Sequence, residues 1–150
     1  MSVVNPSQRQ KIVIVNTGCA NISSVRFALE RLGVEVDVSD DVNVIKNADK
    51  VFLPGVGTAA AAMASIKQKA LVETLQSLTQ PVLGVCLGMQ LMVETSAEGG
   101  FQGTGNIDCL NLMPGHVARM ESKGVRLPHM GWNTVSHNSG HKEESLFKGI

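Results

Sequence analysis

The clearest candidate for chemistry in this sequence is a cysteine between two glycines. Residues 81–90 read PVLGVCLGMQ, so Cys86 has Gly84 two positions before it and Gly88 two positions after it. Glycines at this spacing let the backbone turn sharply from a strand into a helix around an exposed nucleophile. A thiol there also meets the positive end of the helix dipole, which favours the thiolate. The pattern predicts a nucleophilic cysteine. The same glycine spacing also fits a cysteine that is only a small buried residue where a strand meets a helix.

A cysteine that attacks a carbonyl needs hydrogen-bond donors for the oxyanion. The N–H of Leu87, the residue after the cysteine, is one predicted donor. The segment PGVG, residues 54–57, directly follows another predicted strand, and Gly55 and Gly57 let the peptide groups around Val56 turn toward the site. Losing one such donor typically reduces the rate by about a hundredfold to a thousandfold.

The other cysteines and the histidines are weaker candidates. Cys19 also lies between a predicted strand and a predicted helix, but it has a glycine on one side only, and Cys109 lies in a loop context. A histidine would suit as the base that activates a thiol. None of the four follows a strand in a pattern that points to the cysteine turn, so they are interpreted as surface or core-edge residues. They are His116, His129, His137 and His141.

Strands and helices are predicted to alternate along the chain and to position these residues. KIVIV at 11–15 is a β-branched run typical of a strand buried in a parallel sheet. A helical stripe follows, with Asn21 as its N-cap and Gly33 as its stop. This order predicts an α/β fold, an open, doubly wound and mainly parallel sheet that binds ligands at the carboxyl ends of its strands. Further strands are expected at 34–38, 50–53, 81–85, 116–120 and 132–135, and helices within 58–78 and at 88–94.

The bulk composition bounds the type of protein. The chain has 150 residues, 43% of them hydrophobic, which suits one domain over residues 1–150. Basic and acidic residues both number 13 without long blocks, which argues against a nucleic-acid or anionic-membrane surface. No apolar run approaches the roughly 18 residues that span a bilayer. Three cysteines without metal-type spacing, and no secretory segment, favour reduced thiols in the cytoplasm, with no metal and no cofactor.

Four motifs together resemble the class I glutamine amidotransferases. They read NTGCANISSV at 16–25, LPGVGTA at 53–59, PVLGVCLGMQL at 81–91 and LPHMGWN at 127–133. The first and last are similar to one branch of that family, the glutaminase subunits of imidazole glycerol phosphate synthases. The resemblance runs over most of residues 11–150 and implies the flavodoxin-like α/β fold of the family.

The resemblance implies a reaction and roles for residues near the cysteine. Cys86 would attack the side-chain amide of glutamine, ammonia would leave from the resulting glutamyl thioester, and water would release glutamate. Residues 55–57 match the oxyanion strand, which is expected to need a peptide flip, so that the enzyme stays idle until its partner is engaged. Gln90 matches a residue that contacts bound glutamine, and Glu98 matches the acidic residue that receives the α-amino group.

The implied partner is the cyclase subunit of imidazole glycerol phosphate synthase, a (β/α)8 barrel, either fused or in a heterodimer. Ammonia would be added there to a phosphoribulosyl-formimino aminoimidazole carboxamide ribonucleotide, giving imidazole glycerol phosphate for histidine biosynthesis. From its residue type alone, the single tryptophan, Trp132, would be interpreted as a core or rim residue, whereas the LPHMGWN motif favours an interface anchor. The positions that match the subunit interface are Asn16, Asn21, Met130, Trp132 and Asn133.

Two features depart from the family pattern. The first loop reads TGCAN where many members have YGxGN, which we expect to matter little. The family's catalytic histidine and glutamate lie in a His-Pro-Glu motif that these 150 residues do not contain. Acid–base help is worth about a hundredfold to ten-thousandfold, so we expect an incomplete C-terminus and at best a very weak glutaminase in this chain alone.

Two alternative functions fit parts of the same pattern. In the first, the chain would be a catalytically silent docking module for the cyclase. In the second, it would be a cysteine hydrolase of the related peptidase-like branch. Gln90, Glu98 and LPHMGWN argue against the second alternative.

Overall fold

The computed structural model describes residues 10–98 and 105–134. The chain divides into two compact units, Met1–Arg119 and Met120–Ile150. Every helix and strand of the described residues lies in the first unit. In the second unit, residues 120–134 have no regular structure, so the strand predicted at 132–135 is wrong over 132–134, and Val135 lies outside the described residues.

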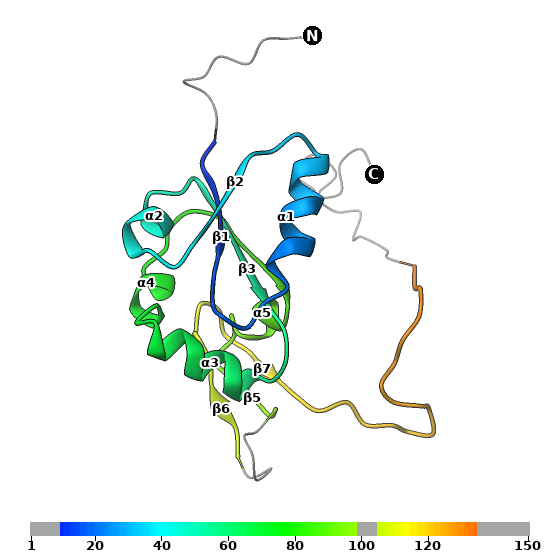
Figure 1. The fold of residues 1–150 in the computed structure, drawn as a ribbon. Coiled ribbons are helices and arrows are strands. Elements are labelled where there is room, and N and C mark those ends of the chain that lie inside the picture. Colours follow the sequence, from blue (N-terminus) through cyan, green and yellow to red (C-terminus); the bar gives the residue numbers. More distant parts are fainter. Residues whose placement is uncertain (1–9, 99–104, 135–150) are drawn as a thin grey trace, which may run out of the picture. The chain divides into compact units, whose positions relative to one another are not determined.

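The first unit is built on a four-stranded parallel sheet in the order β2-β1-β3-β4 (Figure 1). This arrangement confirms the predicted α/β fold, because parallel neighbours require crossover connections. The β-branched run of the first strand is buried along its whole length, as a central parallel strand should be. The strands are β1 (Ile12–Val15), β2 (Val36–Ser39), β3 (Lys50–Gly55) and β4 (Val82–Cys86).

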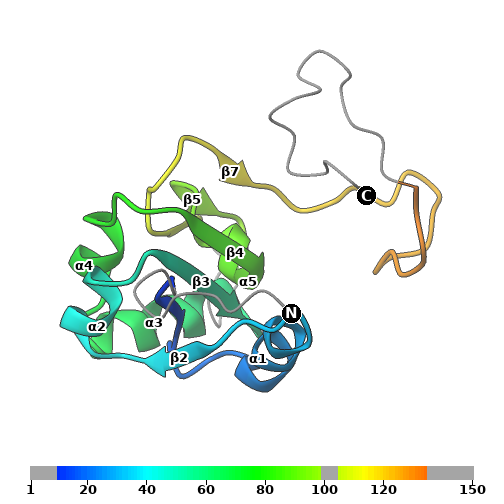
Figure 2. The ribbon, with the colours of Figure 1, turned by 90° about the horizontal axis from the view of Figure 1, so that it is seen from above.

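Helices cover both faces of this sheet, with α1 on one side and α2, α3 and α4 on the other (Figures 1 and 2). Leu29 of α1 packs with Ile12 and Ile14 of β1, whereas Ile66 of α3 belongs to the larger core that contains Val13. Alternate residues of one strand thus serve two cores, which is the layering of a doubly wound fold. The helices are α1 (Ile22–Arg31), α2 (Val42–Lys46), α3 (Ala59–Gln68) and α4 (Val72–Gln76).

The ends of α1 follow the predicted caps. The Asn21 side chain accepts a hydrogen bond from the Ser24 N–H at 3.3 Å. At the other end Gly33 has φ +76°, and the Val34 N–H donates to the Leu29 carbonyl, which closes a Schellman motif. Val34 therefore still belongs to the helix cap, and β2 begins two residues later than predicted.

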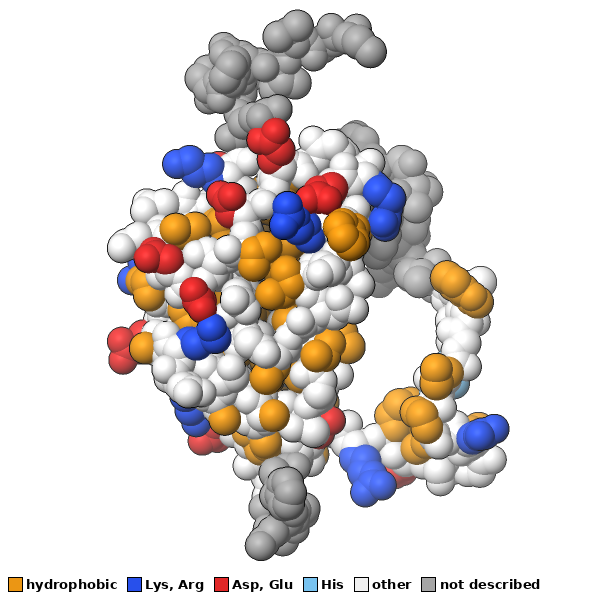
Figure 3. Space-filling model, viewed as in Figure 1, with side chains coloured by type: hydrophobic (Ala, Val, Ile, Leu, Met, Phe, Trp, Pro, Cys, Tyr) orange, Lys and Arg blue, Asp and Glu red, His pale blue; other side chains and the backbone are white. Residues whose placement is uncertain are grey.

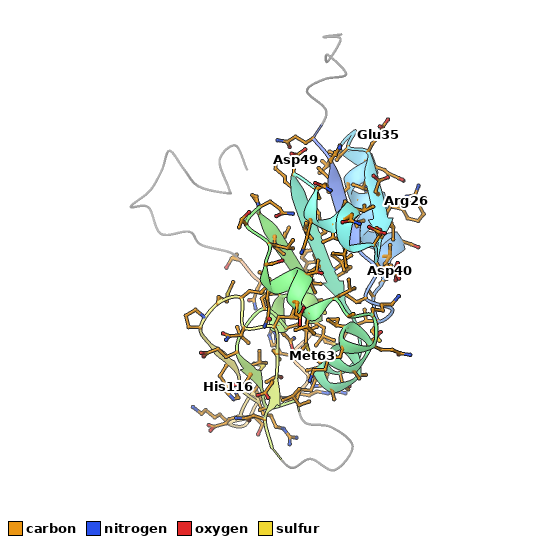
Figure 4. The ribbon with its side chains drawn as sticks, turned by 90° about the vertical axis from the view of Figure 1, so that its left-hand side faces the viewer. Arg26, Glu35, Asp40, Asp49, Met63 and His116 are labelled. Atoms are coloured by element: carbon orange, nitrogen blue, oxygen red, sulfur yellow. The ribbon has the colours of Figure 1, made fainter. Side chains whose placement is uncertain are left out.

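A second, smaller sheet has the order β6-β5-β7. Its strands β5 (Thr95–Ser96), β6 (Ile107–Asp108) and β7 (His116–Val117) have two residues each, so the strand predicted at 116–120 is shorter than expected. β5 is antiparallel to β6 and parallel to β7. The Thr95 Oγ1 and His116 Nδ1 atoms lie 2.8 Å apart across this sheet (Figure 4 labels His116).

The helix after β4 is much shorter than predicted. α5 spans Leu87–Gln90, one turn, instead of residues 88–94. The chain then leaves the helical path because the Leu91 and Met92 carbonyls accept hydrogen bonds from the N–H groups of Leu110 and Leu112. Pairing with a segment almost twenty positions away replaces the second helical turn.

The surface carries charges of both signs. On the face shown in Figure 3, acidic and basic side chains are interspersed around exposed hydrophobic ones. A search of residues 10–98 and 105–134 for membrane-spanning helices finds no candidate.

Candidate active site

The backbone at Cys86 makes a sharp turn out of β4. Cys86 has φ +55° and ψ −121°, is exposed, and lies at the N-cap of α5. A non-glycine residue with positive φ costs of order 1–3 kcal/mol, so the surrounding structure must hold it there. The strand-to-helix turn is the one that the glycine spacing predicted. Because α5 has only one turn, its dipole is small, and the predicted activation by the helix is weaker than for a long helix.

The two flanking glycines are required by close backbone packing. A Cβ on Gly84 would lie 2.5 Å from the Cα of Met89. A Cβ on Gly88 would lie 1.8 Å from the Leu53 carbonyl oxygen of β3. Both separations are far shorter than any normal contact, so only glycine lets the turn fold back on itself and press against β3.

The PGVG segment lies beside this turn. β3 continues through Pro54 into Gly55, two residues further than predicted, and Gly55 pairs with Cys86 in the parallel ladder. A Cβ on Gly55 would lie 2.7 Å from the N atom of Gly88. After Gly55 the chain becomes exposed at Val56, and Gly57 has φ +85° with open space around it. The predicted oxyanion segment and the nucleophile thus share one edge of the sheet.

The Val56 N–H, a predicted oxyanion donor, is bonded to a different acceptor. It donates to the Cys19 carbonyl in the first loop at 2.9 Å. This N–H is therefore not available to an oxyanion at Cys86 in the conformation described. Leu87, the other predicted donor, is buried at the start of α5, next to the cysteine. Cys19 is partly buried and packs against the main core, which suits a structural side chain.

The first loop is held against α3 by contacts that sequence reasoning missed. The Ser65 hydroxyl donates to the Thr17 carbonyl at 2.5 Å, and Thr17 is buried. Gly18 has φ +82°, and a Cβ there would lie 2.8 Å from the Ser65 Oγ. Within the loop, Asn16 Oδ1 accepts from the Gly18 N–H at 3.2 Å, and Asn21 caps α1. The glycine at position 18 is a sequence signal from which this packing could have been found.

The two predicted glutamine-binding residues lie on different segments. Gln90 is half-buried at the end of α5, one helical turn beyond Cys86. Glu98 follows β5, and its Oε2 accepts a hydrogen bond from the Ala59 N–H at the start of α3, with a distance of 3.0 Å. Sequence reasoning missed this bond, because the two residues are 39 positions apart.

The remaining predicted interface residues belong to the second unit. Met130 and Trp132 are 87% and 103% exposed, and Asn133 is also exposed. The structure therefore places Trp132 at the surface, against the core interpretation of a lone tryptophan. His129 also lies in this unit, whereas His137 and His141 lie outside the described residues.

Cys109 is a packing residue. It lies in the main core, where burial and, to a smaller extent, the neighbouring Asp108 charge raise the pKa of its thiol. Burial thus opposes the thiolate that a nucleophile needs. Over residues 10–98 and 105–134, the side chains form no group of three or more His, Cys, Asp or Glu able to hold a metal ion.

Residues 13–150 match the family model described as glutamine amidotransferase class-I. The chain belongs to the class I glutamine amidotransferase family. This assignment confirms the predicted family. The fold and the turn around Cys86 agree with it.

Several relatives of high identity are each named imidazole glycerol phosphate synthase subunit HisH. The protein of Colwellia psychrerythraea is 56% identical over 149 residues, covering 93% of this chain and 65% of the relative. That of Shewanella loihica is 51% identical, covering 92% and 62%, and that of Idiomarina loihiensis is 57% identical, covering 83% and 60%. The chain thus spans less than two thirds of the length of these three relatives.

Proposed function

We propose that this chain acts as the glutaminase subunit of an imidazole glycerol phosphate synthase. The observation that carries the proposal is the exposed Cys86 at a positive-φ turn, directly beside Gly55 of the PGVG segment. The family match and the names of the relatives support the same reaction. The partner is a (β/α)8-barrel cyclase that receives ammonia in a cytoplasmic heterodimer.

The reaction begins when the Cys86 sulfur attacks the side-chain amide carbon of glutamine. The Leu87 N–H and, once its peptide group has rotated, the Val56 N–H receive the oxyanion of the tetrahedral intermediate. Ammonia leaves with a proton from a general acid, and a glutamyl thioester remains on Cys86. Water then attacks the thioester and releases glutamate and the free thiol. Gln90 and Glu98 hold the substrate, the latter through its α-amino group.

Partner dependence is supported by the bond between the Val56 N–H and the Cys19 carbonyl. The first loop also contains Asn16 and Asn21, two predicted interface residues. Engagement of the cyclase by this loop would move the Cys19 carbonyl and release the Val56 N–H toward Cys86. The idle conformation and the interface are thus connected through one hydrogen bond.

None of the residues given a role above can act as the general acid and base. The sequence has no His-Pro-Glu motif, and the His116 ring is bonded to Thr95 in the small sheet. We propose that these 150 residues on their own turn over glutamine very weakly. Glutamate release by these 150 residues and by the longer Colwellia psychrerythraea relative, each with its cyclase, tests this directly.

The decisive experiment measures glutamate release by the full-length protein with its cyclase present. Cys86→Ala should lower kcat by more than about a thousandfold, because the covalent route is lost. Cys19→Ala is the matched control and should stay within about threefold of the wild type, since its partly buried side chain only packs against the core. Normal turnover in Cys86→Ala would refute the proposal. A wild type that binds the cyclase but releases no glutamate would be a silent docking module.

A further inference from the structure

The start of α3 has two caps of different origin. Thr58 is the local N-cap, and its Oγ1 accepts from the Ala61 N–H at 3.3 Å. The second cap is the Glu98 carboxylate, whose Oε2 accepts from the Ala59 N–H at 3.0 Å. A carboxylate at a helix N-terminus forms a charge-assisted hydrogen bond and interacts favourably with the helix dipole. A helix that already has a threonine cap is thus also tied to a distant segment.

Glu98 is itself held on a fixed support. Its N–H donates to the hydroxyl of Ser96, which is fully buried in β5. Ser96 pairs with Ile107 on one side and Val117 on the other, and the Ala97 N–H donates to the Val117 carbonyl at 2.8 Å. The carboxylate therefore extends from the small sheet and anchors α3 to it.

The residue that Glu98 holds lies just after the predicted oxyanion segment. Gly55, at the front of that segment, is buried and paired with Cys86. Ala59, at its back, is fully buried and bonded to Glu98. Only residues 56–58 lie between them, and all three are exposed. Any rotation of the peptide groups there takes place between two fixed ends.

We propose that Glu98 is a positioning residue for residues 56–58, in addition to its predicted contact with the α-amino group of glutamine. This inference rests on the proposed glutaminase function. A carboxylate accepts several hydrogen bonds, so one Glu98 side chain holds the Ala59 N–H through Oε2 and receives the substrate ammonium as well. Bound glutamine and the oxyanion segment are thereby connected through a single residue.

The two roles of Glu98 predict different kinetic losses. A residue that only binds the α-amino group affects substrates that carry this group, chiefly through KM. A residue that fixes the oxyanion segment affects the chemical step for any amide substrate. Glutaramate, which keeps the side-chain amide of glutamine but lacks the α-amino group, distinguishes the two.

The test uses the full-length protein with its cyclase and compares Glu98→Ala, Glu98→Gln and the wild type. We expect Glu98→Ala to lower kcat for glutaramate and for glutamine by about tenfold to a hundredfold, the range of one charge-assisted hydrogen bond. Glu98→Gln keeps an oxygen acceptor and should recover part of the glutaramate rate. Glu94→Gln is the matched control, because Glu94 also accepts from a backbone N–H, that of Gly115, but has no bond to α3.

Amide hydrogen exchange without substrate provides a second measurement. In Glu98→Ala the Ala59 amide should exchange about tenfold to a hundredfold faster than in the wild type, and faster exchange should extend to residues 56–58. Unchanged exchange at Ala59, or wild-type kcat on glutaramate with only a raised KM for glutamine, would overturn the inference and leave the glutaminase proposal intact. Absence of glutamate release by the wild-type complex would instead refute both the role of Glu98 and the proposed glutaminase function.

Discussion

Replacement of Gly88 by alanine tests the close packing that shapes the cysteine turn. The added Cβ would lie 1.8 Å from the Leu53 carbonyl oxygen and 3.0 Å from the Pro54 carbonyl carbon. Ordinary contacts require α5 and β3 to separate by about 1–2 Å. Both contact atoms are backbone, so no side-chain rotation relieves the clash. We expect Gly88→Ala to lower the free energy of unfolding by about 3 kcal/mol or more.

Gly33→Ala is the control for the effect of losing a glycine. Gly33 has φ +76°, and nothing lies within 4 Å of a Cβ placed there. Its replacement costs only the left-handed backbone conformation, about 1–2 kcal/mol. For a protein of this size, 1 kcal/mol corresponds to a change of roughly 3 °C in Tm. Gly88→Ala should therefore lower Tm by about 10 °C, and Gly33→Ala by about 3–6 °C.

The assay is urea unfolding of the full-length protein, followed by far-UV circular dichroism, together with a thermal scan. Gly88→Ala should also lower glutamate release, because Leu87 and its N–H move with the displaced backbone. Equal destabilisation by Gly88→Ala and Gly33→Ala would show that steric contact with β3 is not what requires glycine at position 88.

Three further predictions follow from described residues. Iodoacetamide at neutral pH should alkylate exposed Cys86 first and leave Cys109 intact until unfolding, because Cys109 is buried and burial raises the pKa of its thiol; peptide mass spectrometry that finds equal labelling of both would contradict this. The hydrogen bond and charge of Lys69 lower the pKa of Asp40 (labelled in Figure 4), so the pair stabilises the protein above the ordinary carboxyl pKa and this contribution is lost as the pH falls through the lowered pKa. Urea unfolding from pH 7 to pH 2 should therefore show a smaller loss of unfolding free energy with falling pH for Asp40→Asn than for the wild type. The same pH dependence in both proteins would exclude the pair as a cause of the acid destabilisation. Trp132→Ala should weaken cyclase binding at least tenfold in calorimetry with Tm unchanged, because the side chain is fully exposed; unchanged affinity would refute its interface role.

The strands and caps that depend on local patterns were predictable from the sequence. The β-branched run at β1 and the caps of α1 at Asn21 and Gly33 each depend on residues that are close to them in the sequence. The turn at Cys86 was predictable for the same reason, because the need for glycines on both sides is local. The position of the PGVG segment beside it followed from the general rule that parallel strands bring their carboxyl ends to one edge.

Features that depend on distant contacts were not predictable. α2 and the strands of the small sheet are too short for a periodic pattern, although Asp41 does cap α2. α5 ends early because Leu91 pairs with Leu110, which no local pattern reveals. The bonds of Val56 to Cys19 and of Glu98 to Ala59 likewise join segments far apart in the chain. These long-range bonds carry the proposed control of the site.

The contact of Gly88 with the Leu53 carbonyl also limits how this site can be regulated. Because the two backbones already touch, α5 and β3 cannot approach further, and the parallel ladder holds β4 with its cysteine beside β3. Tuning by gradual closing of the gap between α5 and β3 is therefore excluded. What stays free is the orientation of the peptide plane at Val56, whose N–H, in the proposed mechanism, is bonded either to the Cys19 carbonyl or to an oxyanion at Cys86. Regulation at this edge should thus resemble a toggle, so partial engagement by a partner would change the fraction of active molecules and leave the rate of each active molecule unchanged.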